Sequence, residues 1–354
     1  MMTKAMESQL RPHLQTTDNN VFRRCEKLYK QRHIINNISK TSMKQQLKQY
    51  ELQSTDIDNA WNDMIDLTNI DRDKLPNNII LHAIDISPSH NTVSTLQSTS
   101  QLYSFTHIPG FYIIHNALNI QQQLYWCSKC VTQYSTAKHN NLTNLQPDID
   151  TTQLWSNAVH SNNFIEFNKL RWSSLGYHYD WTQRTYSADN KDDIFDPELS
   201  LLCTTAANLC SQDILCESAI VNYYVDGGSM GGHVDDAELT DSKPIVSVSL
   251  ASDCIFLLGG KTRNIRPTAF KLHSGDITVM SGESRLYYHG VPRILEHTFD
   301  IDAASKYIDN NNIEQQRLLK YLSTARLNIN VRQVVDEQHN FDNTFKESYN
   351  TVYK

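Results

Sequence analysis

The chain has 354 residues, of which 39% are hydrophobic, and a formal net charge of −7. This length can bury one large core and predicts about two domains, while the negative charge excludes a uniformly basic protein that coats nucleic acid. The charge is uneven, because residues 1–50 hold ten Lys and Arg against three Asp and Glu. Such a segment is typical either of a solvated extension or of a basic arm that contacts phosphates.

Seven cysteines, an odd number without regular spacing, predict a reducing intracellular compartment. We expect the nucleus or the cytoplasm. The Lys, Arg, Ser and Thr of the N-terminus are also typical of a mitochondrial transit peptide, although Glu7, Asp18 and Glu26 weaken that interpretation. No apolar run reaches the roughly 18 residues of a spanning helix, so we expect no membrane partner. We also expect a monomer.

Residues 1–105 form a polar N-terminal extension with one amphipathic helix near residues 20–33. An apolar stripe on this helix is expected to dock on the main domain, and basic side chains cover its other side. The stripe is Phe22, Cys25, Leu28 and Tyr29, and the basic side chains are Arg23, Arg24, Lys27 and Lys30. The rest of the extension is expected to hold connections with short helical pieces. The main domain is expected at 106–336, followed by a polar tail at 337–354.

The first part of the main domain mixes strand, helix and loop. The predicted elements are a strand at 111–114, a helix at 119–135, an Asn-rich loop at 138–163 and a helix at 197–210. Cys127 and Cys130 would be half of a zinc site, but no second pair matches them. Because the apolar residues around them have helical spacing, we expect both thiols on a buried helix face.

Aromatic residues are frequent between 170 and 186, where they alternate with Arg171 and Arg184. In an extended chain Tyr177, Tyr179 and Trp181 fall on one side, with Trp172 and Tyr186 flanking them. Aromatic rings interleaved with arginines suit stacking on a nucleobase. The alternative is an aromatic hairpin packed on the core.

From residue 219 onward the pattern changes to short strands separated by Gly-rich turns. The predicted strands are 219–225, 245–250, 254–259, 266–273, 276–281, 286–294 and 326–335. Many short strands with helices upstream predict an α+β fold, a jelly roll (double-stranded β-helix) with supporting helices. Residues 297–323 interrupt the strands as an insertion with a helix at 313–322.

The segment 222–235, N-Y-Y-V-D-G-G-S-M-G-G-H-V-D, carries the first chemical signal. Its first half alternates like a strand, four glycines break it, and His233 and Asp235 follow two residues apart. Residues two apart in extended backbone point to the same side. An imidazole and a carboxylate so placed are two thirds of the 2-His-1-carboxylate triad of non-haem Fe(II) oxygenases.

His289, in the segment Y-Y-H-G-V-P-R, is the natural third ligand because antiparallel strands of a small barrel can bring it to His233. His273 competes with it, but the Ser-Gly-Asp that follows is typical of a turn. A single histidine in a strand is more often structural than a ligand.

The last strand, R-L-N-I-N-V-R, places polar and apolar residues on opposite faces. Arg326, Asn328, Asn330 and Arg332 share one face, which is costly in a core strand unless these side chains bind a charged group. A guanidinium matches a carboxylate in a forked pair. An edge strand with a solvated face is the alternative.

Together these motifs resemble the AlkB family of Fe(II)/2-oxoglutarate-dependent dioxygenases over roughly residues 165–336. The resemblance rests on N-x-Y before H-x-D, on G-E-S-R-L-x-Y-H-G ending near His289, and on R-x-N-x-x-x-R at 326–332. The stretches L-G-Y-H-Y-D-W, G-G-H-V-D, F-L-L-G-G and H-S-G-D-I, with the helix F-R-R-C-E-K-L-Y-K-Q, make it most similar to the AlkB homologue 1 subgroup.

The resemblance implies a role for each matching residue. His233, Asp235 and His289 would bind Fe(II) and form the catalytic centre, with 2-oxoglutarate and O2 as co-substrates. The side chains that would hold 2-oxoglutarate are Asn222, Tyr224, Asn328 and Arg326, with Arg326 on its distal carboxylate. Arg332 would face the substrate, and Tyr177, Trp181 and Trp172 belong to the segment that resembles the nucleotide-recognition lid. Ala237 replaces an acidic residue of bacterial AlkB that helps to read the base, so base preference is not transferred, and Asp236 and Glu238 stay unassigned.

The implied reaction is oxidative demethylation or hydroxylation of methylated bases in nucleic acid, with tRNA favoured and single-stranded or unpaired DNA as a further substrate. Succinate and CO2 are released, and N-methyl groups leave as formaldehyde. The target base must be unpaired or flipped to reach the iron.

Two other functions remain open at this point. The run Gly227-Gly-Ser-Met-Gly231 matches the G-x-S-x-G motif of serine hydrolases, with Ser229 as nucleophile. That motif needs a helix directly after the serine, which Gly231, Gly232 and Pro244 disfavour. A jelly-roll binding protein without metal is the second alternative, and it would be expected to lack a ligand.

Overall fold

The structure is a computed structural model, and it describes residues 20–37, 59–86, 92–180, 185–192, 195–225 and 227–335. For residues 31–37 and 188–189 it describes the backbone alone. The predicted tail at 337–354 and Trp181 lie outside the described residues. Within the part described, none of the helices combines the length and apolar character that a bilayer crossing requires.

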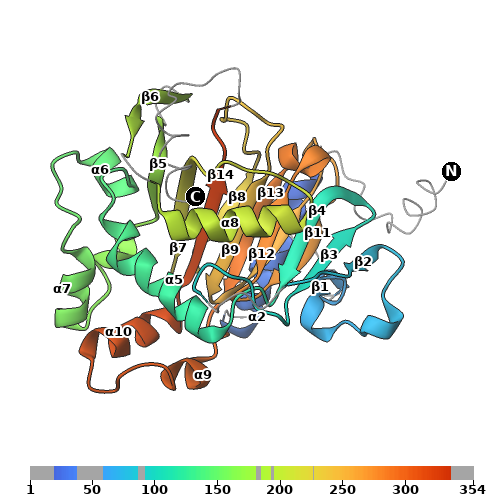
Figure 1. Cartoon of the computed structure of the whole chain (residues 1–354). Coiled ribbons are helices and arrows are strands. Elements are labelled where there is room, and N and C mark those ends of the chain that lie inside the picture. Colours follow the sequence, from blue (N-terminus) through green and yellow to red (C-terminus); the bar gives the residue numbers. More distant parts are fainter. Residues whose placement is uncertain are drawn as a thin grey trace.

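Two β-sheets build the main body, as the predicted jelly roll requires, and helices cover one of them (Figure 1). In spatial order, the nine-stranded sheet contains β2 (Ile79–His82), β3 (Gln101–Phe105), β4 (Ile108–His115), β12 (Ile277–Met280), β9 (Ile245–Ala251), β14 (Arg326–Arg332), β7 (Ser218–Tyr224), β5 (Trp172–Asp180) and β6 (Thr185–Lys191). The five-stranded sheet contains β1 (Ile65–Asp66), β11 (Thr268–Leu272), β10 (Asp253–Leu258), β13 (His289–Leu295) and β8 (Met230–His233).

Period-two alternation in the central strands separates two cores. On β14, Leu327, Ile329 and Val331 point into the core beneath the helices, while Arg326 and Asn328 line a cavity between the sheets. Aromatic side chains fill the space beside that cavity, with Phe105 and Phe270 rings 4.8 Å apart. The nine-stranded sheet therefore has a helical side and a cavity side.

The helices on the outer face follow the predicted apolar pattern. They are α5 (Ile120–Thr132) and α8 (Pro197–Leu209), and α8 crosses the front of the sheet in Figure 1. In the insertion, α10 (Ile313–Leu322) was predicted and α9 (Ile301–Ser305) was not; α9 packs against α5, and α10 packs against α9. Asn119 and Gln122 close a capping box at the start of α5, and the Asp196 side chain caps α8. Cys127 and Cys130 are fully buried, which confirms that these thiols pack in the core.

Two predictions about irregular segments are wrong. Residues 138–163 contain α6 (Asn141–Leu145) and α7 (Leu154–Ser161). The Asn140 side chain accepts two backbone N–H groups and starts α6, whereas α7 begins without a side-chain cap. The N-terminal extension contributes β1, β2 and β3, not only helical pieces. The predicted boundary at 105 falls inside the β3–β4 hairpin, since the strands on either side of it are paired. The polar composition of this segment did not indicate these strands.

The N-terminal helix α2 (Val21–Asn37) docks by its predicted stripe against β8 and β13. Phe22 is completely buried, as expected. Arg24, one of the four basic side chains predicted on the other side of α2, and Glu26 are also buried. The polar side of a helix becomes buried when neighbouring loops supply its partners.

An ion cluster around His273 holds β1 against β11. The His273 ring contacts Asp66 at 2.9 Å through Nε2 and Asp253 at 3.0 Å through Nδ1, and Lys271 lies 3.4 Å from Asp66. Burial lowers the pKa of His273, but the two carboxylates outweigh burial and raise it to about 10. His273, the competing candidate ligand, is therefore used as a cation that joins two strands.

Replacing His273 with glutamine is expected to lower the free energy of unfolding by about 3 kcal/mol at pH 6, because two carboxylates lose a buried partner. The folded-state pKa of about 10 lies above the ordinary 6.5, so this stabilisation is complete below pH 6.5 and is lost as the pH rises toward 10. Urea unfolding of parent and variant across this range measures the difference. His160→Gln, at an exposed histidine of α7, is the control, and a difference that did not shrink at high pH would contradict the prediction.

Candidate active site

The three predicted metal ligands meet at one end of the five-stranded sheet. His233 ends β8 and His289 begins β13, and the two residues are direct partners in the antiparallel pair. Asp235 follows β8 by two residues, with its carboxylate 3.6 Å from His233 Nε2 and 3.8 Å from His289 Nε2. One ligand atom from each of the three lies within 4.8 Å of the others, a spacing that can hold one metal ion.

Both histidines are oriented by the carbonyl two residues earlier. His233 Nδ1 lies 2.9 Å from Gly231 O, and His289 Nδ1 lies 3.0 Å from Tyr287 O. Because a carbonyl only accepts, each Nδ1 carries the proton and each Nε2 has a free lone pair. Burial and the nearby His233 lower the pKa of His289 to about 4, so its imidazole is neutral, which is the metal-binding form.

A buried charge network keeps Asp235 ionised. Burial opposes ionisation, but Arg332, at 3.4 Å, and the two histidines outweigh it and hold the pKa of Asp235 below its usual range. Glu238 joins Arg332, at 2.7 Å, to Arg285, at 2.8 Å, and Arg285 also donates to the Asp235 carbonyl. Arg332 is therefore buried against Asp235 and Glu238, next to the candidate metal ligands.

The sequence motifs did not assign a role to Arg285 or Glu238. Arg285 stands inside the G-E-S-R-L run, and Glu238 lies three residues beyond Asp235. Both side chains are only 1% exposed. An arginine and a glutamate that are both buried must be paired, but only the folded chain identifies the partner.

Arg326 is a buried guanidinium without a carboxylate partner in the described part of the chain. Its Nη2 donates to Ser249 Oγ at 3.0 Å, its Nη1 contacts Ser252 O at 3.4 Å, and its Nε has no partner. An unpaired buried charge is unfavourable, so this group is prepared for an anionic ligand. The distal carboxylate of 2-oxoglutarate fits this requirement.

The other predicted co-substrate residues lie around the same cavity. Tyr224 and Asn328 line it with Arg326 and the three candidate ligands, while Asn222 contacts Asn328 Oδ1 at 3.5 Å from the neighbouring strand. Burial raises the pKa of Tyr224, so its hydroxyl remains a donor. Phe256 and other apolar side chains also line the cavity.

The predicted substrate residues differ in how exposed they are. Tyr177, in β5, is buried in a small cluster with Tyr186 and Val334, as the packed-hairpin alternative predicts for this residue. Trp172 is half-buried at the start of β5, opposite Asn222. The Tyr186 hydroxyl of β6 lies 3.3 Å from Glu238. This contact connects the β5–β6 hairpin to the ion pairs of Glu238 with Arg285 and Arg332.

Comparison with known proteins identifies this arrangement. The family model described as the 2OG-Fe(II) oxygenase superfamily matches residues 110–332. The chain belongs to this superfamily. As a 2OG-Fe(II) oxygenase it is a dioxygenase that uses Fe(II), 2-oxoglutarate and O2.

Relatives of this 2OG-Fe(II) oxygenase share most of its length. The human protein named nucleic acid dioxygenase ALKBH1 is 34% identical over 74% of this chain and 74% of its own. The Arabidopsis thaliana DNA N(6)-methyladenine demethylase ALKBH1A is 32% identical over 90% of this chain and 96% of its own. The Schizosaccharomyces pombe tRNA demethylase abh1 is 29% identical over 66% of this chain and 82% of its own. The chain is thus similar to the AlkB homologue 1 group that the motifs indicated.

The hydrolase alternative fails on local structure. Ser229 is followed by strand β8, not by the helix that a nucleophile elbow requires, and β8 brings His233 to His289. The alternative of a binding protein that lacks a ligand also fails, because all three candidate ligands are present and close together.

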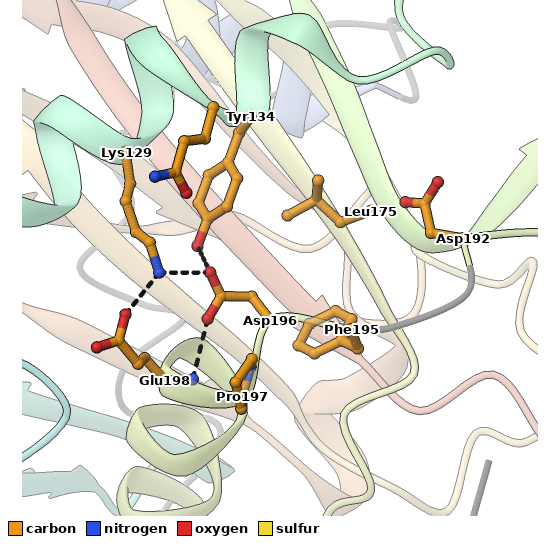
Figure 2. Close-up of a pocket in the computed structure, with 9 residues that line it drawn as sticks. Lys129, Tyr134, Leu175, Asp192, Phe195, Asp196, Pro197 and Glu198 are labelled. Carbon is orange, nitrogen blue, oxygen red and sulfur yellow. Dashed lines mark hydrogen bonds and ion pairs between the residues drawn. The ribbon is translucent and has the colours of Figure 1, made fainter. Parts of the chain in front are cut away.

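A second cavity, of about 290 Å³, lies away from these ligands between α5, β5 and the start of α8. Figure 2 shows that Lys129, Asp196 and Glu198 face one another, whereas Asp192 lies apart from them. Lys129 lies 2.6 Å from both Asp196 and Glu198, and the Tyr134 hydroxyl donates to Asp196. These groups satisfy one another and cap α8, so the cavity is a by-product of helix packing.

Proposed function

We propose that this dioxygenase demethylates or hydroxylates methylated bases in nucleic acid, with tRNA favoured and single-stranded or unpaired DNA as a further substrate. The observation that carries the proposal is the similarity, over 66% to 90% of the chain, to relatives named nucleic acid dioxygenase, DNA N(6)-methyladenine demethylase and tRNA demethylase. The proposed Fe(II) ligands are His233, Asp235 and His289.

Charge near the site supports a polyanionic substrate. Exposed or half-exposed basic residues are found on α2, next to β8 and β13, and on the loop after β10; they are Arg23, Lys27, Lys30, Lys261 and Arg266. Cations on these elements can bind phosphates whatever the base sequence. Tyr179 in β5 and Tyr186 in β6 supply aromatic rings 5.4 Å apart in the hairpin attached to Glu238.

The residues divide the chemistry between them. Arg326 would bind the distal carboxylate of 2-oxoglutarate, and Asn328 and the Tyr224 hydroxyl would orient the rest of the co-substrate. When bound, Fe(II) would couple oxidation of 2-oxoglutarate by O2, to succinate and CO2, with hydroxylation of the substrate methyl group. A hydroxymethyl group on nitrogen then breaks its C–N bond, giving formaldehyde and an N–H base, whereas one on carbon remains.

Anaerobic reconstitution with Fe(II) and 2-oxoglutarate, followed by O2 and a panel of methylated tRNA and single-stranded DNA, tests the proposal. We expect the parent to remove or oxidise methyl groups with matching succinate, and His233→Ala to be inactive. Methyl loss that persists in His233→Ala would refute the metal assignment. Succinate formation by the parent, with every nucleic acid in the panel unchanged, would refute the substrate class.

A further inference from the structure

The peptide that joins Gly231 to Gly232 connects the N-terminal helix to a proposed metal ligand. Its N–H, on Gly232, donates to the Glu26 carboxylate at 2.6 Å. Its C=O, on Gly231, accepts from His233 Nδ1 at 2.9 Å. Glu26 is buried, at 8% exposure, so water competes little for this bond. A carboxylate, a peptide and an imidazole thus form one continuous chain of hydrogen bonds.

This chain controls the His233 ring. A carboxylate that accepts the peptide N–H polarises the peptide, which makes its C=O a better acceptor for Nδ1–H. The Nδ1 proton is then held in place, and Nε2 is directed toward Asp235 as a more basic ligand. Carboxylates that bond directly to metal-binding histidines act in the same way, and here a peptide stands between the two groups.

His289 provides an internal comparison. It makes the same contact to the carbonyl two residues earlier, but the peptide that follows Tyr287 donates its N–H, on Tyr288, to the neutral carbonyl of Gly260 at 2.9 Å. The His289 side chain is 8% exposed, whereas that of His233 is 34% exposed, on β8 at the sheet edge. The carboxylate therefore supports the histidine that packing restrains less.

Two glycines, Gly232 in β8 and Gly259 after β10, leave space for α2. A Cβ on Gly232 would lie 2.4 Å from the Phe22 ring, and one on Gly259 would lie 3.0 Å from it, so larger residues at Gly232 would displace the helix. Arg263 completes the attachment, since its Nη2 donates to Gly232 O at 2.9 Å and its carbonyl accepts from Phe22 N at 2.9 Å. Helix α2 and strand β8 therefore pack closely around the Gly231–Gly232 peptide.

We infer that Glu26 is a positioning residue for His233, and that α2 is thereby part of the metal site. The inference rests on the proposed role of His233 as an iron ligand. Residue 26 lies outside the segment 110–332 that the superfamily model matches, so this contact reaches the metal site from outside the common domain. Loss of the contact weakens the metal site without removing a ligand.

Co(II) binding to the full chain tests this inference, measured by titration and by the Co(II) ligand-field spectrum, with thermal unfolding of the metal-free protein alongside. Glu26→Ala is expected to weaken Co(II) binding about 10-fold, the lower limit for loss of an outer ligand partner. Glu26→Gln keeps an acceptor oxygen but loses the charge, so it should weaken binding about 3-fold, shift the spectrum and leave the melting temperature of the metal-free protein unchanged. Glu166→Gln, at an exposed carboxylate paired with Lys169, is the matched control and should bind Co(II) like the parent.

Unchanged Co(II) affinity and spectrum in folded Glu26→Gln would overturn the inference, even if Glu26→Ala failed to fold. Failure of the proposed function has a different signature. If His233→Ala bound Co(II) as tightly as the parent, the metal assignment itself would fail, and the inference with it.

Discussion

Arg326→Met is expected to raise the KM for 2-oxoglutarate roughly 100-fold while leaving the metal-free protein as stable as the parent, or more stable by about 1–2 kcal/mol. The parent guanidinium is 1% exposed and has no carboxylate partner in the described chain, so methionine removes an unfavourable buried charge. The same change deletes the guanidinium fork that is proposed to bind the distal carboxylate. Succinate formation against 2-oxoglutarate concentration and urea unfolding without co-substrate measure the two effects.

Arg332→Met is the matched control for this prediction, because it makes the same substitution six residues along the same strand. Arg332 has Asp235 and Glu238 as partners, so its loss leaves two buried carboxylates and should cost about 3–5 kcal/mol of stability. Equal loss of stability in Arg326→Met and Arg332→Met would show that Arg326 has a structural partner rather than a vacant place for a ligand.

Asp235→Asn is expected to reduce 2-oxoglutarate turnover more than about 100-fold, because it removes the negative ligand and keeps the shape of the side chain. The amide binds Fe(II) weakly, and Arg332 retains Glu238 at 2.7 Å, so the fold should survive. Turnover, Fe(II) affinity and far-ultraviolet circular dichroism together separate loss of the ligand from loss of the structure.

Asp236→Asn is the control for this change, since Asp236 is the exposed neighbour and belongs to no ion pair in the described structure. It should retain the activity of the parent. If the two asparagine variants lost turnover equally, the effect would come from the net charge of the loop, and the assignment of Asp235 as ligand would fall.

Local sequence patterns were sufficient for the central strands and for the candidate ligands. In β14 the alternation of Leu327, Ile329 and Val331 with polar residues is a period-two signal that the sheet preserves, because one face meets the helices and the other the cavity. His233 and Asp235 are two residues apart, so their proximity is a local property. His289 was found by chemistry and distance along the chain, and β8–β13 pairing places it opposite His233.

Tertiary structure alone decided which charged groups pair. Arg332, predicted to face the substrate, pairs with Asp235 and Glu238, and Glu26, which received no role from the sequence, meets Gly232 across 206 residues of chain. Likewise β2 pairs with β3, and β3 with β4, in a segment predicted to hold only connections and helical pieces, while Asn140 caps α6 in a segment predicted as a loop. Periodicity reports which face of an element is buried, but a hydrogen bond or an ion pair depends on the position of its partner, and the sequence determines that position only through the whole fold.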